Sequence, residues 1–178
     1  MAERKIRWRM KGLCFFLGTA LLLVGCGYHF AGRGDNIDPA IKTIFVETFD
    51  NRTSEAQAAN YFQNAFASQF VQRGRFRLAA NLQEADAICR GTILALHTGS
   101  LSYQASNLAA EERMTVTLSI ALEESKSGKV LWASQNFVGT SEYAVAAVGA
   151  TEANRRNALI KLADDTAERA YRLMMSGF

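Results

Sequence analysis

The sequence predicts an α+β domain in which two helices pack on one face of a mixed sheet of four to five strands. Two amphipathic helical stretches, 54–73 and 151–174, enclose segments in which apolar and polar residues alternate. Alternation with a period of two indicates strands, whereas apolar residues three or four positions apart indicate helices. An early and a late helix can cover the same apolar sheet face. The expected order, β-α-β-β-β-β-α, therefore forms a two-layer sandwich.

The first half of the domain contains the first strand and the first helix. The alternation in TIFVETF, residues 43–49, indicates a strand, and the polar DNRTSE after it indicates a turn. Ser54 is placed to cap helix 54–73, with Gln57 completing a capping box, and Gly74 follows the helix end. The opposite face of this helix carries Gln and Asn rather than Lys and Arg, which disfavours a membrane-surface helix. We expect packing on the sheet through Ala59, Phe62, Phe66 and Phe70.

The second half supplies the remaining strands. RFRLAA indicates a short strand, and residues 87–103 indicate a long one. In MTVTLSIALEE, residues 114–124, apolar residues alternate almost perfectly with small polar ones, so one face belongs to the core. The other face is solvated or available to a partner, and it carries Thr115, Thr117, Ser119 and Ala121. ESKSGK is predicted to be a hairpin turn with Gly128 at its tip, and KVLWASQNFVGTSEY is the returning strand.

The first residues are typical of a bacterial lipoprotein signal. MAERKIRWRMK is a positive n-region, and the apolar stretch of 14 residues after it is too short to span a bilayer, which needs about 20. A lipobox follows, formed by Leu23, Val24, Gly25 and Cys26. We therefore expect a signal peptide at 1–25, acyl chains such as palmitate on Cys26, a tether at 26–42 and a single domain at 43–178. The alternative is an uncleaved signal anchor with an incidental cysteine.

The charge distribution argues against nucleic acid as a partner. The chain has 20 basic and 17 acidic residues. Residues 1–25 hold five of the basic residues and one acidic residue, so the remainder has 15 basic and 16 acidic residues and a net charge of −1. A basic patch of the kind that binds nucleic acid therefore disappears once the signal is removed.

The sequence contains no arrangement of residues that indicates catalysis, a cofactor or a metal. His29 and His97 lie on the expected tether and on a long strand, and no His, Cys, Asp or Glu cluster has the spacing of metal ligands. A serine-nucleophile motif of the Gly-x-Ser-x-Gly type is also missing. Cys14 leaves with the signal and Cys26 is acylated, so Cys89 is the one remaining thiol, expected as a small buried apolar residue. We expect no enzymatic activity.

Several stretches in order resemble one family. CGYHFAGRG is followed by IKTIFVETFDNRT, EADAICRGTI, RMTVTLSIALEESKSGKVLW and a helix EANRRNALIKLADDTAERAYRLM. This arrangement resembles the LptE family of lipopolysaccharide-assembly lipoproteins of Gram-negative outer membranes. The resemblance implies a non-catalytic plug inside the LptD β-barrel. Such a plug helps the barrel fold, binds lipopolysaccharide and assists its insertion into the outer leaflet. It also implies two helices on a four-stranded sheet.

Two groups of residues are candidates for contacts with these partners. Arg113, Lys126 and Lys129 are basic residues at strand ends or near the hairpin tip, suited to the phosphates of lipid A or to the barrel wall. The alternative for the two lysines is an ordinary solvated turn. The Thr and Ser face of residues 114–124 suits a wet barrel lumen, in which many hydrogen bonds form without a large apolar patch.

The alternative function is a lipoprotein that activates a periplasmic cell-wall synthase. Such a protein usually needs a long, Pro-rich linker to reach the cell wall. The tether here has about 15 residues and extends at most roughly 50 Å, which favours a partner in the membrane itself. Gly27 follows Cys26 in place of the Asp that commonly retains lipoproteins in the inner membrane. We therefore expect the chain at the outer membrane, on its periplasmic side.

Overall fold

The computed structural model describes residues 37–103, 109–145 and 149–176. The predicted signal peptide, most of the predicted tether and His29 lie outside the described residues. So do the four lipobox residues, Leu23, Val24, Gly25 and Cys26.

The described residues form six strands, two α-helices and one short 3-10 helix. The strands are β1 (Thr43–Val46), β2 (Asp50–Asn51), β3 (Arg77–Leu78), β4 (Ala87–Tyr103), β5 (Ala109–Glu124) and β6 (Val130–Ala144). The helices are α2 (Ala58–Gln72), α3 (Ala150–Ser176) and the 3-10 helix η1 (Leu82–Glu84).

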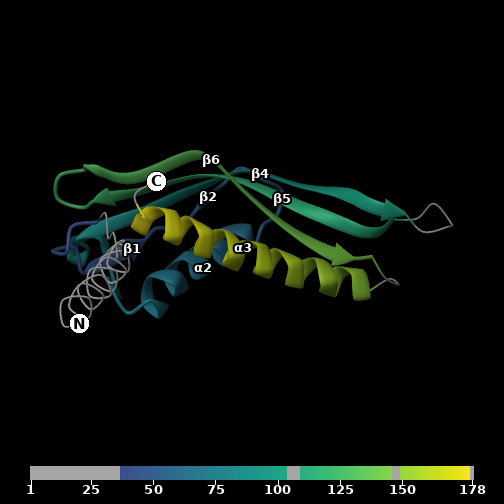
Figure 1. The fold of residues 1–178 in the computed structure, drawn as a ribbon, viewed down its shortest axis with the longest axis horizontal. Helices are drawn as coiled ribbons and strands as arrows, with labels where there is room; N and C mark the ends of the chain where they lie inside the picture. The colour runs from purple at the N-terminus through teal and green to yellow at the C-terminus, as the bar shows by residue number, and fades with distance from the viewer. Residues whose placement is uncertain (1–36, 104–108, 146–148, 177–178) are drawn as a thin grey trace, which may run out of the picture. The chain divides into compact units, whose positions relative to one another are not determined.

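The predicted fold class is confirmed. The strands form one mixed sheet in the order β3-β1-β4-β5-β6, and β2 pairs with β4 beyond the end of β1. β1 is parallel to β3 and β4, whereas β4, β5 and β6 are antiparallel neighbours. Both α2 and α3 lie on the same side of the sheet (Figure 1). The result is the expected two-layer arrangement, with one sheet face covered and the other open.

β2 is a strand that the sequence did not predict, and it lies in the segment expected as a turn. Asp50 and Asn51 pair in parallel with Thr92 and Ile93 of β4. Asp and Asn disfavour strands, so no local pattern indicated this pairing. Phe49, just before β2, holds the chain against β4, because its ring lies where a Cβ atom on Gly91 would be, 2.0 Å from Phe49 Cε1.

The first helix begins later than predicted, and the predicted capping box at Ser54 is absent. Asn51 organises the turn instead, since its Oδ1 accepts hydrogen bonds from the Thr53 N–H (3.0 Å) and hydroxyl (2.8 Å). Its Nδ2 donates to the Glu55 carbonyl at 2.8 Å. Gln57 precedes the helix without a side-chain cap, and its Oε1 accepts a hydrogen bond from the Tyr61 hydroxyl at 2.6 Å. The hydrogen bonds of Asn51 therefore hold the chain in a turn up to residue 55, and α2 begins only at Ala58.

The core lies between the helices and the covered sheet face. Phe62, Phe66 and Phe70 of α2 are fully buried, as the helical stripe predicts; the Phe49 ring stacks on Phe62 and lies tilted against Phe66. The apolar face of β5 is buried along its length, whereas the intervening Thr and Ser residues are half-buried. Ile37 and Ile41, within the range expected as the tether, are also buried in this core. The packed part of the chain therefore begins before β1.

Candidate functional site

The helices leave the other face of the sheet uncovered (Figure 1). Opposed residues of antiparallel strands project to the same face. This face therefore carries two rows across β4, β5 and β6, namely His97–Thr115–Thr140 and Ala95–Thr117–Val138. The predicted alternation of β5 is confirmed, since Met114, Val116 and Leu118 are fully buried on the other side. The face can offer hydroxyl groups to a partner, and Val138, which is 45% exposed, adds an apolar side chain.

Irregular pairing hollows this face near its middle. The register shifts between Ile93 and Ala95 in the β4–β5 pair, and between Leu118 and Ile120 in the β5–β6 pair. A bulge bends a strand and changes the direction of nearby side chains. One hollow of about 340 Å³ is lined by Arg52, Thr92, Leu94, Ser119, Gln135 and Asn136. A second, of about 230 Å³, shares Thr92 and Ser119 with the first. The two hollows adjoin at these shared residues, and we call them together the polar depression; amide, hydroxyl, guanidinium and carboxylate groups line it.

Charges on this part of the sheet are paired. The Arg90 guanidinium bonds Glu47 at 2.9 Å and Glu123 at 2.6 Å. The hydrogen bond that Arg90 donates to Glu47 is the largest cause of the raised pKa of Arg90. Arg52 lies 3.3 Å from Asp50 in a solvent-exposed pair. Exposed pairs add little to stability, but together they leave this region polar and nearly neutral.

The three basic candidates do not lie together. Arg113 is near the beginning of β5 and bonds Glu142 of β6 at 2.5 Å. Lys126 and Lys129 are exposed in the turn after the end of β5. A strand rises about 3.3 Å per residue, so Arg113 and the lysines are roughly 40 Å apart. They belong to opposite ends of the sheet, and one small ligand cannot contact both ends.

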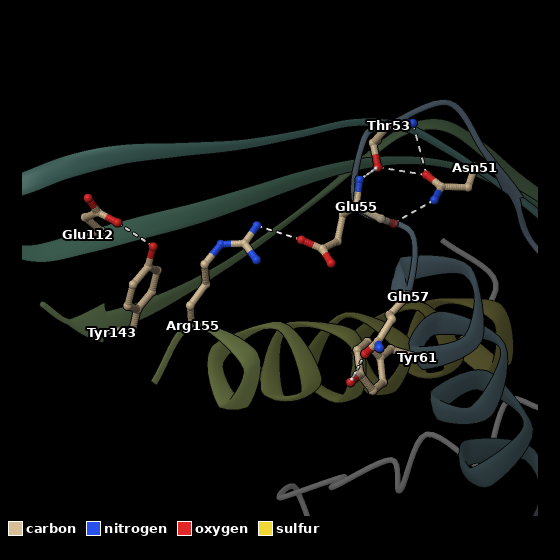
Figure 2. Close-up of polar contacts among 8 residues, drawn as sticks. All are labelled: Asn51, Thr53, Glu55, Gln57, Tyr61, Glu112, Tyr143 and Arg155. Atoms are coloured by element: carbon tan, nitrogen blue, oxygen red, sulfur yellow. Dashed lines mark hydrogen bonds and ion pairs between the residues drawn. The ribbon is translucent and has the colours of Figure 1, made fainter. Parts of the chain in front are cut away.

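Away from the open face, a group of polar contacts joins the loop before α2 to the beginning of α3 (Figure 2). The Arg155 guanidinium bonds the Glu55 carboxylate at 2.7 Å, and both side chains are partly buried. This hydrogen bond is the main cause of the raised pKa of Arg155. The Tyr143 hydroxyl donates to Glu112, and burial followed by this contact raises the pKa of Tyr143 to about 12. Glu55 and Arg155 are a hundred residues apart in sequence, and no local pattern could have predicted their contact.

The described residues contain no site suited to metal binding. In residues 37–103, 109–145 and 149–176, no three His, Cys, Asp or Glu residues lie close enough to hold an ion. Cys89 is fully buried, and burial raises the pKa of its thiol to about 12, so it is protonated at neutral pH. The prediction of a buried, apolar Cys89 is therefore confirmed. His97 is exposed at the edge of the open face. Within the described part of the chain, neither helix has both the length and the hydropathy needed to cross a membrane.

The fold is shared with solved structures of bacterial lipoproteins. Uncharacterized lipoprotein B from Nitrosomonas europaea superposes with a TM-score of 0.56 at 12% identity, over 85% of this chain and 92% of that one. A Caulobacter crescentus CB15 protein assigned as a lipoprotein gives 0.54 at 10% identity, over 75% and 89% of the two chains. No curated protein sequence matches significantly. The fold defines a small α+β domain with two helices on one face of a mixed sheet.

Sequence comparison identifies the family. The profile of the LptE family, described as lipopolysaccharide-assembly, matches residues 41–174. The match covers both helices except the last two residues of α3, together with all six strands. The chain belongs to the LptE family.

Proposed function

We propose that this chain is an outer-membrane lipoprotein that plugs the LptD β-barrel, helps it assemble and assists lipopolysaccharide insertion without catalysing a reaction. The signal at 1–25 is removed, acyl chains on Cys26 anchor the protein on the periplasmic side, and the domain binds the barrel. Membership of the LptE family supports this proposal.

The observation that carries the proposal is the open face of the sheet. A folded plug in a wet lumen needs a surface that forms hydrogen bonds to the wall and retains water. The face formed by β4, β5 and β6 meets this need, with Thr115, Thr117 and Thr140 among paired charges. Both helices lie on the other side, so nothing in the described chain covers it (Figure 1).

Charge insertion tests the open face. Thr115→Asp with Thr117→Asp places two carboxylates at half-buried positions facing the expected wall. The complex should then fail to co-purify with the barrel, because uncompensated charges lose hydration there. Gln72→Asp with Asn157→Asp adds the same charge at exposed helix positions and should leave the yield unchanged. A normal yield of the Thr115/Thr117 variant, with its fold verified by circular dichroism, would remove this face from the interface.

Crosslinking in cells identifies the class of partner. A tagged chain carrying a photoreactive residue at Thr140 should crosslink to an outer-membrane barrel. Recovery of a penicillin-binding protein instead would contradict the plug and support the activation of a cell-wall synthase.

A further inference from the structure

The end of the sheet at the β5–β6 turn combines exposed basic and apolar side chains. Lys126 and Lys129 are exposed in the turn, Val130 is 54% exposed immediately after it, and Leu82 of η1 is 39% exposed. The Ser125 N–H donates to the Asp86 carbonyl at 2.8 Å, and the Ser125 hydroxyl donates to the Leu82 carbonyl at 3.4 Å. These bonds place η1 beside the turn. We call Leu82, Lys126, Lys129 and Val130 the hairpin-end surface.

The chain leading to the acylated cysteine joins the domain at the same end. The Lys42 N–H donates to Asp86 at 3.0 Å, and the Arg77 N–H donates to the Lys42 carbonyl at 2.9 Å. Arg75 links this region to α3, because its guanidinium contacts both the Ile37 carbonyl and Met175. The end of α3 and the β5–β6 turn also appear at the same side in Figure 1.

Tether length makes this end the one nearest to the anchor. Ten residues lie between Cys26 and Ile37, which corresponds to a typical span of about 20 Å and a maximum of about 40 Å. The 17 residues of β4 extend about 55 Å. The far end, with Leu101 and Arg113, is therefore farther from the anchor than the hairpin end by most of a strand length.

We infer that the hairpin-end surface rests on the lipid headgroups of the membrane in which Cys26 is anchored, and this inference rests on the proposed acylation. Basic residues beside exposed apolar ones are the combination that binds an anionic interface. The carboxylates at this end already accept hydrogen bonds within the fold: Glu84 from Asn81, Asp86 from Thr43, and Glu124 from Ser127.

The turn is also suited to a surface with little free water. Its backbone is paired internally, since the Gly128 N–H donates to the Glu124 carbonyl and the Glu124 N–H donates to the Lys129 carbonyl, both at 2.9 Å. The Lys129 N–H donates to the Ser127 hydroxyl at 3.1 Å. Contact with headgroups therefore leaves these polar groups satisfied.

Site-directed fluorescence quenching tests the contact. The full acylated chain carries a single bimane label at Leu82→Cys, Val130→Cys or Leu101→Cys. It is reconstituted in vesicles of phosphatidylethanolamine and phosphatidylglycerol that contain a headgroup nitroxide lipid. Leu101 is a matched control, because it is also 39% exposed but lies at the other end. Cys89 does not interfere, because it is fully buried.

We expect loss of fluorescence at positions 82 and 130 and unchanged fluorescence at 101. Lys126→Glu with Lys129→Glu should restore the fluorescence at 82, whereas Arg156→Glu with Lys161→Glu on α3 should not. Equal quenching at 82 and 101 in floating, acylated protein would overturn the inference and leave the proposed function intact. The inference would also be overturned if a co-purified barrel covered the labels at positions 82 and 130 and the nitroxide lipid did not quench them. Protein that lacks acyl mass and fails to float would refute the anchor and with it this inference.

Discussion

Replacing Gly91 with alanine tests whether Phe49 and β4 fit together as closely as the structure shows. A Cβ atom at position 91 would lie 2.0 Å from Phe49 Cε1 and within 2.4 Å of two neighbouring ring atoms. Ordinary contacts between carbon atoms are about 3.5–4.0 Å, so the ring must move by more than an ångström. The ring is 2% exposed and packs on Phe62 and Phe66, with centroids 6.3 and 5.1 Å away.

The expected loss of stability follows from these contacts. Overpacking a core costs about 1–3 kcal/mol, and weakening two aromatic pairs adds about 0.5–1.5 kcal/mol each. These contributions add to about 2–6 kcal/mol. Because the ring can partly relax, we expect a value in the lower half of this range, so Gly91→Ala should reduce the free energy of unfolding by about 3 kcal/mol. For a chain of this size the melting temperature should fall by roughly 6–12 °C.

Urea denaturation of the acyl-free mature chain, followed by circular dichroism, measures this change. Gly99→Ala in the same strand is the matched control, because nothing lies within 4 Å of its added Cβ atom; its stability should change little. Phe49→Leu should relieve the clash, so that the double variant Phe49→Leu/Gly91→Ala loses less than the sum of the single losses. Strict additivity, or a Gly91→Ala variant as stable as Gly99→Ala, would refute this packing of Phe49.

Three further predictions follow from other parts of the chain. Cys26→Ala should leave the domain folded but unanchored, and mass spectrometry that finds no acyl mass on the wild-type N-terminus would contradict the lipoprotein assignment. The Lys42 N–H and the Thr43 hydroxyl lower the pKa of Asp86 below 3.8, so its stabilising effect should be complete above that pH. This effect is lost as the pH falls through the lower folded-state pKa. The stability of the wild type should therefore exceed that of Asp86→Asn by a constant amount at higher pH, and the difference should shrink below pH 3.8. Curves that stay parallel through this range would count against this role of Asp86. Arg113→Glu and the pair Lys126→Glu/Lys129→Glu should affect lipopolysaccharide binding differently, because they change opposite ends of the sheet. Equal loss in a binding titration would argue for non-specific charge attraction.

The fold was predictable where local periodicity carries the information. Alternation in β5 separated Val116 and Leu118, which are buried, from Thr115 and Thr117, which are on the open face. The Phe stripe of α2 likewise predicted which side of that helix enters the core. Side chains point to the same side at every second residue of a strand and at every third to fourth residue of a helix. This period belongs to the element itself, so the pattern of apolar residues in a single sequence shows it.

Features that depend on distant pairing were not predictable in the same way. Asp50 and Asn51 form β2 because Phe49 holds the chain against β4, although both residue types disfavour strands. The Glu55–Arg155 contact and the bulges that form the polar depression depend on which strands and helices become neighbours.

The sequence by itself determined the types of the long helices and strands, the core face of α2 and β5, and the resemblance to the LptE family. Tertiary structure decided that Arg113 and the two lysines belong to opposite ends, and that Leu82 lies beside the β5–β6 turn at the end where the tether joins. The physical reason is that hydrophobic periodicity is written locally, residue by residue. The grouping of surface side chains follows instead from strand register and chain reversal, which are set by contacts between segments far apart in the chain.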